Sequence, residues 1–141
     1  MEKRNNKSHK ILVIEDVKDW MENIKTLIEK KGYLVIPAIN FTSAREIIQS
    51  DNKDYTDLAL ILLDLKLPDG SGLDLMDLVF PRWERDKTRI VIVTSEGWVY
   101  ESEKAQTYPF YFDYVSKNLD SFEQDLGEII NTAIKMREDE S

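Results

Sequence analysis

Five short apolar runs alternate along the chain with segments whose apolar residues recur at helical spacing, and this alternation constrains the fold most. The runs are expected to be strands and lie at residues 11–14, 33–36, 58–63, 90–93 and 112–115. Strands separated by helices are typical of βα units, in which a parallel sheet is covered by helices on both faces. The middle run is apolar at all six positions, 58–63, as a strand buried on both faces requires. We therefore expect an α/β fold with a doubly wound, five-stranded parallel sheet.

The segments between these runs predict the helices and their ends. Helices are expected at residues 18–31, 73–80, 98–106 and 122–134, with a short one capped by Thr42 or Ser43. Gly32 is placed to cap the first of them. Pro81 is expected to end the third, because proline disrupts a helix interior. The helix at 98–106 has the weakest pattern, since its apolar positions are few.

Composition excludes several classes of protein. The 141 residues fit one domain, and 19 basic against 27 acidic side chains give a formal charge of −8, which repels nucleic-acid backbones. There is no cysteine, so disulfides and thiolate metal sites are excluded. No apolar stretch reaches transmembrane length or the length of a signal-peptide core, which favours a cytoplasmic protein.

The ends of the chain are read as tails around one domain. We expect a basic tail over residues 1–9, the domain over 10–137 and an acidic, solvated tail over 138–141. No effector domain follows the last helix in this sequence, so either the output uses the domain's own surface or the chain is a fragment of a larger protein.

Polar residues stand where four of the predicted strands end. Glu15 and Asp16 follow the first strand, Asp64 the third and Thr94 the fourth, while Lys117 lies just beyond the fifth. Sheets of this kind most often have the strand order 2-1-3-4-5 of flavodoxin-like, three-layer α/β/α folds, and they bind ligands at the carboxyl ends of the strands. Charged residues at strand ends are often merely solvated. Their joint occurrence in four segments predicts one site.

Three carboxylates in one crevice repel each other unless a cation neutralises them. Mg²⁺ prefers oxygen ligands and commonly binds one or two carboxylates together with a phosphate oxygen. The three acids, Glu15, Asp16 and Asp64, therefore predict a Mg²⁺ site.

The chain resembles the receiver domain of bacterial response regulators in two-component systems, from Ile11 to about Arg137. The matching segments are ILVIED at residues 11–16, ILLDLKLPDGSGLDL at 61–75, IVIVTS at 90–95 and DYVSK at 113–117. The resemblance implies a signalling domain that gains and loses its own phosphoryl group, an aspartyl phosphate, and is not a turnover enzyme.

The resemblance also implies a role for each acid. Asp64 would accept the phosphoryl group from a sensor histidine kinase or a histidine phosphotransfer protein. Asp16, Asp64 and the backbone carbonyl of Lys66 would bind Mg²⁺, and Glu15 would hold a metal-bound water. Lys66 and Glu96 would face each other over the site and tune hydrolysis.

The remaining positions concern the phosphoryl oxygens and the output. The resemblance makes Thr94 and Lys117 partners of the phosphoryl group, and Thr94 and Tyr114 the switch residues. Ser95 is small, as the family needs at the position after this threonine so that the phosphoryl group has access to the site. The output surface would be formed by the fourth helix, fifth strand and fifth helix, where phosphorylation would control formation of a homodimer or binding of a protein target. Binding to nucleic acid or to a membrane is not expected.

Three features depart from the family pattern. Glu15 replaces a more common aspartate. Asn118 stands where proline is usual, so the direction of the Lys117 side chain depends on the conformation of this loop. Third, residues 108–112 are unusually aromatic. We expect Phe112 and Tyr114 to share one face of an edge strand, with Phe110 and its neighbour Tyr111 forming either core or an exposed patch.

Three alternatives belong to other classes. A pseudo-receiver would bind partners without phosphorylation. A haloacid dehalogenase-type phosphatase would carry two acids after the first strand, the second of them two residues after the first. Here the residue two positions after Asp64 is Lys66, which is not an acid. Nucleotide binding is weaker still, because no glycine-rich phosphate loop follows the first strand.

Overall fold

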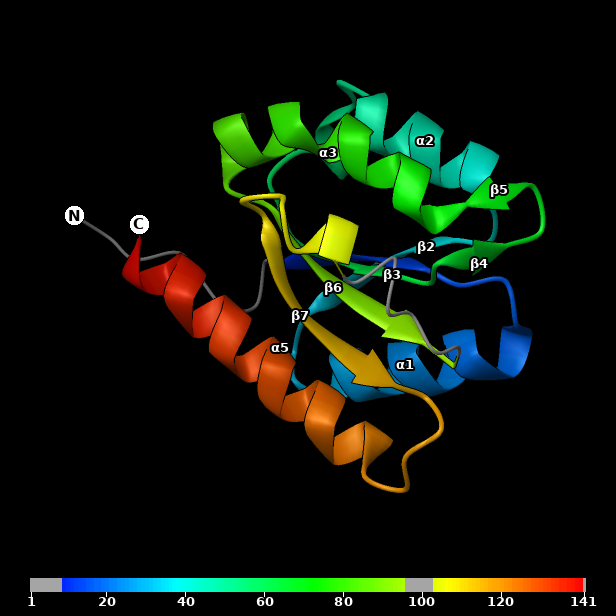
Figure 1. Cartoon of the computed structure of the whole chain (residues 1–141). Coiled ribbons are helices and arrows are strands. Elements are labelled where there is room, and N and C mark those ends of the chain that lie inside the picture. The colour runs from blue at the N-terminus through cyan, green and yellow to red at the C-terminus, as the bar shows by residue number, and fades with distance from the viewer. Residues whose placement is uncertain (1–8, 96–102, 141) are drawn as a thin grey trace.

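The computed structural model describes residues 9–95 and 103–140, which form a sheet between two layers of helices (Figure 1). The five parallel strands are β1 (Lys10–Ile14), β2 (Leu34–Ala38), β3 (Leu58–Leu63), β6 (Arg89–Thr94) and β7 (Tyr111–Ser116). Their order is β2-β1-β3-β6-β7, which confirms the predicted order 2-1-3-4-5. A small hairpin, β4 (Lys66–Leu67) with β5 (Gly70–Ser71), follows β3 and lies outside the five predicted strands.

The helices cover both faces of the sheet. They are α1 (Lys18–Lys30), α2 (Phe41–Gln49), α3 (Gly72–Asp86) and α5 (Phe122–Asp139), with a short 3₁₀ helix at Lys53–Tyr55. Figure 1 shows α2 and α3 on one face and α1 and α5 on the other, so the three-layer α/β/α fold is confirmed. Most of the helix predicted at 98–106 falls outside the described residues. In the part that is described, residues 103–105 are helical. In the described part of the chain, no helix is both long enough and apolar enough to span a membrane.

The core consists of two apolar clusters, one on each face of the sheet. Leu12, Ile61 and Ile90 face α2 and α3, whereas Val13, Leu62 and Val91 face α1 and α5. All six residues of β3 are buried, as its continuous apolar run predicted.

The prediction that Pro81 ends the third helix is wrong, because α3 continues through it to Asp86. A proline inside a helix costs about 3 kcal/mol, so other contacts must stabilise the following turns. Arg82 supplies them: its side chain is 2% exposed. Its guanidinium donates to backbone carbonyls at and after the end of α2, those of Ile47, Ile48, Ser50 and Tyr55.

The predicted cap of the second helix is also corrected. Asn40, and not Thr42 or Ser43, caps α2, and its side chain accepts a hydrogen bond of 2.8 Å from the backbone N–H of Ser43. Gly32 follows α1 with a φ of +89°, a conformation that glycine adopts without a steric penalty, as predicted.

An irregularity in β7 changes which aromatic side chains share a face. Tyr111 pairs with Ile90 but Asp113 pairs with Val91, so Phe112 is an extra residue in the register. Phe112 packs against the cluster under α1 and α5, whereas Tyr111 packs against the opposite cluster. The expectation that Phe112 and Tyr114 share a face is therefore wrong, because Tyr114 pairs with Ile92 of that opposite face. Phe110 is fully buried, so it belongs to the core and to no exposed patch.

Helix α5 runs past the domain boundary expected at residue 137 and ends at Asp139. Glu140 pairs with Arg89 through two hydrogen bonds of 2.8 and 2.9 Å, and Glu138 lies 3.4 Å from the ring of His9. These acids contact the domain, although a solvated tail was expected there.

Candidate functional site

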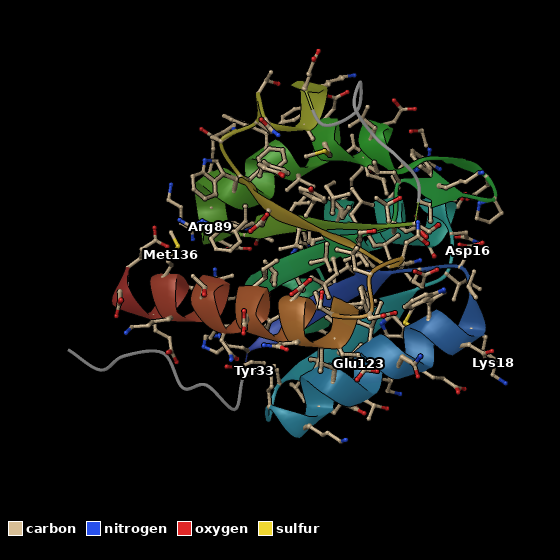
Figure 2. All side chains as sticks on the ribbon, turned by 60° about the horizontal axis from the view of Figure 1, so that its bottom comes forward. Asp16, Lys18, Tyr33, Arg89, Glu123 and Met136 are labelled. Atoms are coloured by element: carbon tan, nitrogen blue, oxygen red, sulfur yellow. The ribbon has the colours of Figure 1, made fainter. Side chains whose placement is uncertain are left out.

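The three acids that follow β1 and β3 are brought together by the pairing of these strands. Ile14 is opposite Leu63 in the parallel register, so Glu15 and Asp64 leave the sheet side by side. Together with Asp16, each offers a carboxylate oxygen within 4.8 Å of those of the other two. Figure 2 shows Asp16 at the end of the molecule opposite to Arg89, the first residue of β6. The acids therefore meet at the carboxyl ends of the strands, as predicted.

Lys117 reaches the same crevice from the end of β7. Its backbone N–H donates to the carbonyl of Thr94 at 3.0 Å, which fixes it beside β6. Its ammonium lies 3.1 Å from Oδ2 of Asp64 and also donates to Oε1 of Glu15. The side chain is 3% exposed. A buried ammonium thus lies between two carboxylates, which offsets the cost of removing these charges from water.

Glu15 and Asp16 differ in their surroundings although they are neighbours. Glu15 is buried and Asp16 is exposed. Burial raises the pKa of Glu15, and hydrogen bonds from Lys117 and from the backbone N–H of Val17 partly offset this rise. Glu15 is therefore a counter-ion of Lys117, while Asp16 faces the solvent side of the crevice.

The loop after β3 holds the carboxylate of Asp64 in place. Its Oδ1 accepts a hydrogen bond of 3.0 Å from the backbone N–H of Lys66. Gly72 returns to the same loop, where its N–H donates to the carbonyl of Leu65 at 2.8 Å. A Cβ on Gly72 would overlap the carbonyl oxygen of Asp64, so this close approach requires glycine. The sequence analysis quoted Gly72 only as part of the segment 61–75 and missed this role.

Above these residues the surface forms a hollow of about 350 Å³. Its lining includes Asp16, Trp20, Asp64, Ser95 and Lys117. Trp20 lies within the helix predicted at residues 18–31, and the sequence analysis did not identify it as part of the site. Nothing in the spacing of Trp20 distinguished it from the core residues of that helix.

A model of the response regulator receiver domain matches residues 11–130. The chain belongs to this family. Response regulator protein PilR of Pseudomonas aeruginosa is 29% identical over 132 residues, which cover 94% of this chain but 27% of PilR. The chain therefore spans only a minor part of the length of that relative.

Solved structures of receiver domains have the same fold. A CheY-like receiver domain from Methanospirillum hungatei has a TM-score of 0.77 and 23% identity, covering 94% of this chain and 98% of that one. Response regulator TrrA from Thermotoga maritima, in complex with Mg²⁺ and BeF, has a TM-score of 0.68 and 22% identity, covering 89% of this chain and 98% of that one.

The structure describes three further residues expected at the site of this receiver domain, Thr94, Tyr114 and Lys66. Thr94 is 1% exposed at the end of β6. Tyr114 is 47% exposed on β7, an edge strand as predicted. The peptide between Lys117 and Asn118 is trans, and the Asn118 side chain donates to the carbonyl of Ser95, so this side chain links the loops after β6 and β7. Lys66 is exposed, whereas its expected partner Glu96 lies outside the described residues.

The donor set of the receiver domain suits a hard divalent cation. Its acids offer only oxygen ligands, and the cluster includes the exposed Asp16 together with the buried Asp64. Such oxygen ligands are preferred by Mg²⁺ over softer metals. The acidic cluster is therefore suited to Mg²⁺.

Proposed function

We propose that this receiver domain takes a phosphoryl group from a phosphohistidine donor onto Asp64 with bound Mg²⁺. The observation that carries the proposal is the position of the Asp64 carboxylate, which lies among two further acids and 3.1 Å from a buried ammonium. In the alternative, a pseudo-receiver, this arrangement would serve no chemistry.

In the proposed reaction, a carboxylate oxygen of Asp64 attacks phosphorus and forms an acyl phosphate. The P–N bond breaks, and its electron pair stays with the imidazole of the donor. Asp64 attacks as a carboxylate, and its Oδ2 lies 3.1 Å from the Lys117 ammonium. Phosphoryl transfer needs mainly in-line positioning and neutralisation of the oxygens of the transferred group. Lys117 and the hydroxyl of Thr94 would bind these oxygens.

Asp16, Asp64 and the backbone carbonyl of Lys66 would bind Mg²⁺, with Glu15 acting through water. Bound Mg²⁺ would supply positive charge next to the phosphoryl oxygens. The complex of TrrA with Mg²⁺ and BeF supports this proposal by its likeness in fold.

The expected partners are a sensor histidine kinase or a histidine phosphotransfer protein. The product would be a phosphorylated signalling domain, not a released metabolite, in keeping with a cytoplasmic signalling protein. Output would pass from Thr94 to Tyr114 and to the surface of β7 and α5, where exposed Tyr114 and Leu119 line a groove of about 310 Å³.

The phosphorylation site is tested by intact-mass analysis after treatment with acetyl phosphate and Mg²⁺. We expect one added phosphoryl group, labile to hydroxylamine, in the wild type. It should be absent from Asp64→Asn and present in Asp74→Asn, which removes an exposed acid of α3. Retention of the group by Asp64→Asn would show that another residue accepts it.

The proposed output is tested by sedimentation with and without beryllofluoride. We expect phosphoryl mimicry to promote a homodimer or binding of a protein target, and Tyr114→Ser to weaken this contact. A monomer under both conditions whose target binding is also insensitive to Tyr114→Ser would contradict the proposed surface.

A further inference from the structure

The indole of Trp20 contacts the ammonium on which the proposed reaction depends. Nζ of Lys117 lies 5.1 Å from the centre of the Trp20 ring. The same ring meets Phe122, the first residue of α5, edge to face, with the ring centres 5.1 Å apart. Figures 1 and 2 both show the beginning of α5 beside α1, the helix that carries Trp20. The indole thus joins the site to the beginning of α5.

Lys117 needs a partner of this kind because its charge is buried. An ammonium has three N–H donors and is strongly hydrated in water. Glu15 and Asp64 accept hydrogen bonds from it. An indole face attracts a cation through the quadrupole of the ring and is the strongest of the aromatic side chains in this respect.

A ring contact and a hydrogen bond constrain the ammonium differently. The bonds to Glu15 and Asp64 require particular directions, whereas a ring face attracts a cation that lies over it anywhere within about 6 Å of the ring centre. An ammonium on this face can therefore shift from Glu15 toward the oxygens of a group on Asp64 without returning to water.

The ordinary explanation is that Trp20 only packs the core, since it lies on the apolar stripe of α1 and contacts the cluster under that helix. Two observations go beyond packing. The ring lines the same hollow as Asp64 and Ser95, and it is only partly buried. A residue needed only for the core would not have to border this hollow.

We propose that Trp20 is a positioning residue that holds the Lys117 ammonium over the site and thereby sets the rate at which Asp64 is phosphorylated. This inference rests on the proposed function and adds a residue to it. With acetyl phosphate as donor, an oxygen of Asp64 forms the bond to phosphorus, and acetate leaves with the electrons of the broken P–O bond. Trp20 acts on this step only through Lys117.

The first test compares phosphorylation rates by acetyl phosphate at saturating Mg²⁺. Trp20→Leu keeps an apolar side chain without a ring, and we expect a loss of about tenfold, the effect of removing a desolvated cation–π contact. Trp20→Phe keeps a ring and should recover part of the rate. Trp83→Leu is the matched control, because the Trp83 ring contacts Lys87 and Arg89 near the opposite end of the sheet. A wild-type rate in Trp20→Leu, or equal losses in Trp20→Leu and Trp20→Phe, would overturn the proposal.

The second test does not depend on phosphorylation. The sequence contains three tryptophans, so Trp83→Phe with Trp98→Phe leaves Trp20 as the single indole. Its fluorescence emission should change when Lys117→Met removes the ammonium and stay constant in Lys31→Met, which removes a lysine bonded to Asn131. Unchanged emission in Lys117→Met would overturn the proposal even if Trp20→Leu failed to fold. If the wild type accepts no phosphoryl group but Lys117→Met still changes the Trp20 emission, the proposed function is refuted. The contact between Trp20 and Lys117 is then established on its own.

Discussion

Buried charge determines how the individual residues of the site behave. Lys117 and Glu15 are both withdrawn from water, with side chains 3% and 1% exposed, and each neutralises the other. The raised pKa of Glu15 shows the remaining cost of its burial. Asp64 shares the same ammonium, so replacing any member of this trio changes the charge that the other two experience. The geometry of Asp64 also depends on a residue without a side chain, Gly72.

The close approach at Gly72 predicts opposite effects of the same substitution at two glycines. In Gly72→Ala the new methyl would meet the Asp64 carbonyl, so we expect a loss of about 1–3 kcal/mol in the free energy of unfolding, together with slower phosphorylation. Gly127 lies inside α5, where a Cβ would be 3.6 Å from the Lys31 ammonium, an ordinary contact. Gly127→Ala should therefore raise this free energy by about 0.5–1 kcal/mol. Urea unfolding of both variants checks this, and equal stability would contradict it.

At the scale of elements, segments distant in sequence fix the ends of α2. Arg82 of α3 binds carbonyls at its C-terminal end. The loop between β4 and β5 binds its N-terminal end: Asp69 accepts hydrogen bonds from the backbone N–H of Phe41 at 2.6 Å and of Thr42 at 3.0 Å. These donors have no partner within the helix itself. The loop that follows Asp64 is thus attached to α2.

The contact of Asp69 predicts a pH-dependent stability. The hydrogen bond from the Thr42 side chain lowers the pKa of Asp69 below its ordinary 3.8 in the folded protein. For an acid with a lowered pKa, the stabilisation is present above the ordinary value and is lost as the pH falls through the folded-state pKa. The Tm of Asp69→Ala should be below that of wild type at pH 7, and the difference should narrow below pH 3.8. A difference that stays constant with pH, or one matched by Asp120→Ala in another loop, would refute the role of this carboxylate.

At the scale of the whole molecule, the two ends of the sheet have different tasks. The carboxyl ends hold the acids, and residues near the C-terminus of α5 bind the opposite end. Near that end Arg137 donates to Asp57 and to the carbonyl of Asp86, and Arg89 pairs with Glu140. These contacts stabilise the fold at the end of the sheet that lies away from the mutually repelling acids.

Because that repulsion exists only in the folded crevice, Mg²⁺ should stabilise the whole domain. A ligand that binds only the folded state at ten times its Kd adds about 1.4 kcal/mol to the free energy of unfolding. We expect millimolar Mg²⁺ to raise the Tm of the wild type but not of Asp16→Asn. Asp19→Asn, which removes an equal charge from the first turn of α1, should keep the gain. An equal gain in Asp16→Asn would rule out Asp16 as a ligand.

The sequence by itself determined the strands, their order and the acids at their ends. An apolar run is a local property of the sequence, and a parallel sheet brings the carboxyl ends of its strands together whatever the side chains are. Only the tertiary structure decided that α3 continues through Pro81, since carbonyls of α2 and of the segment after it bind Arg82. It alone placed Phe112 beneath α1 and α5 and Trp20 against Lys117. These features depend on contacts between residues far apart in the chain, and such contacts leave no periodic trace in the sequence.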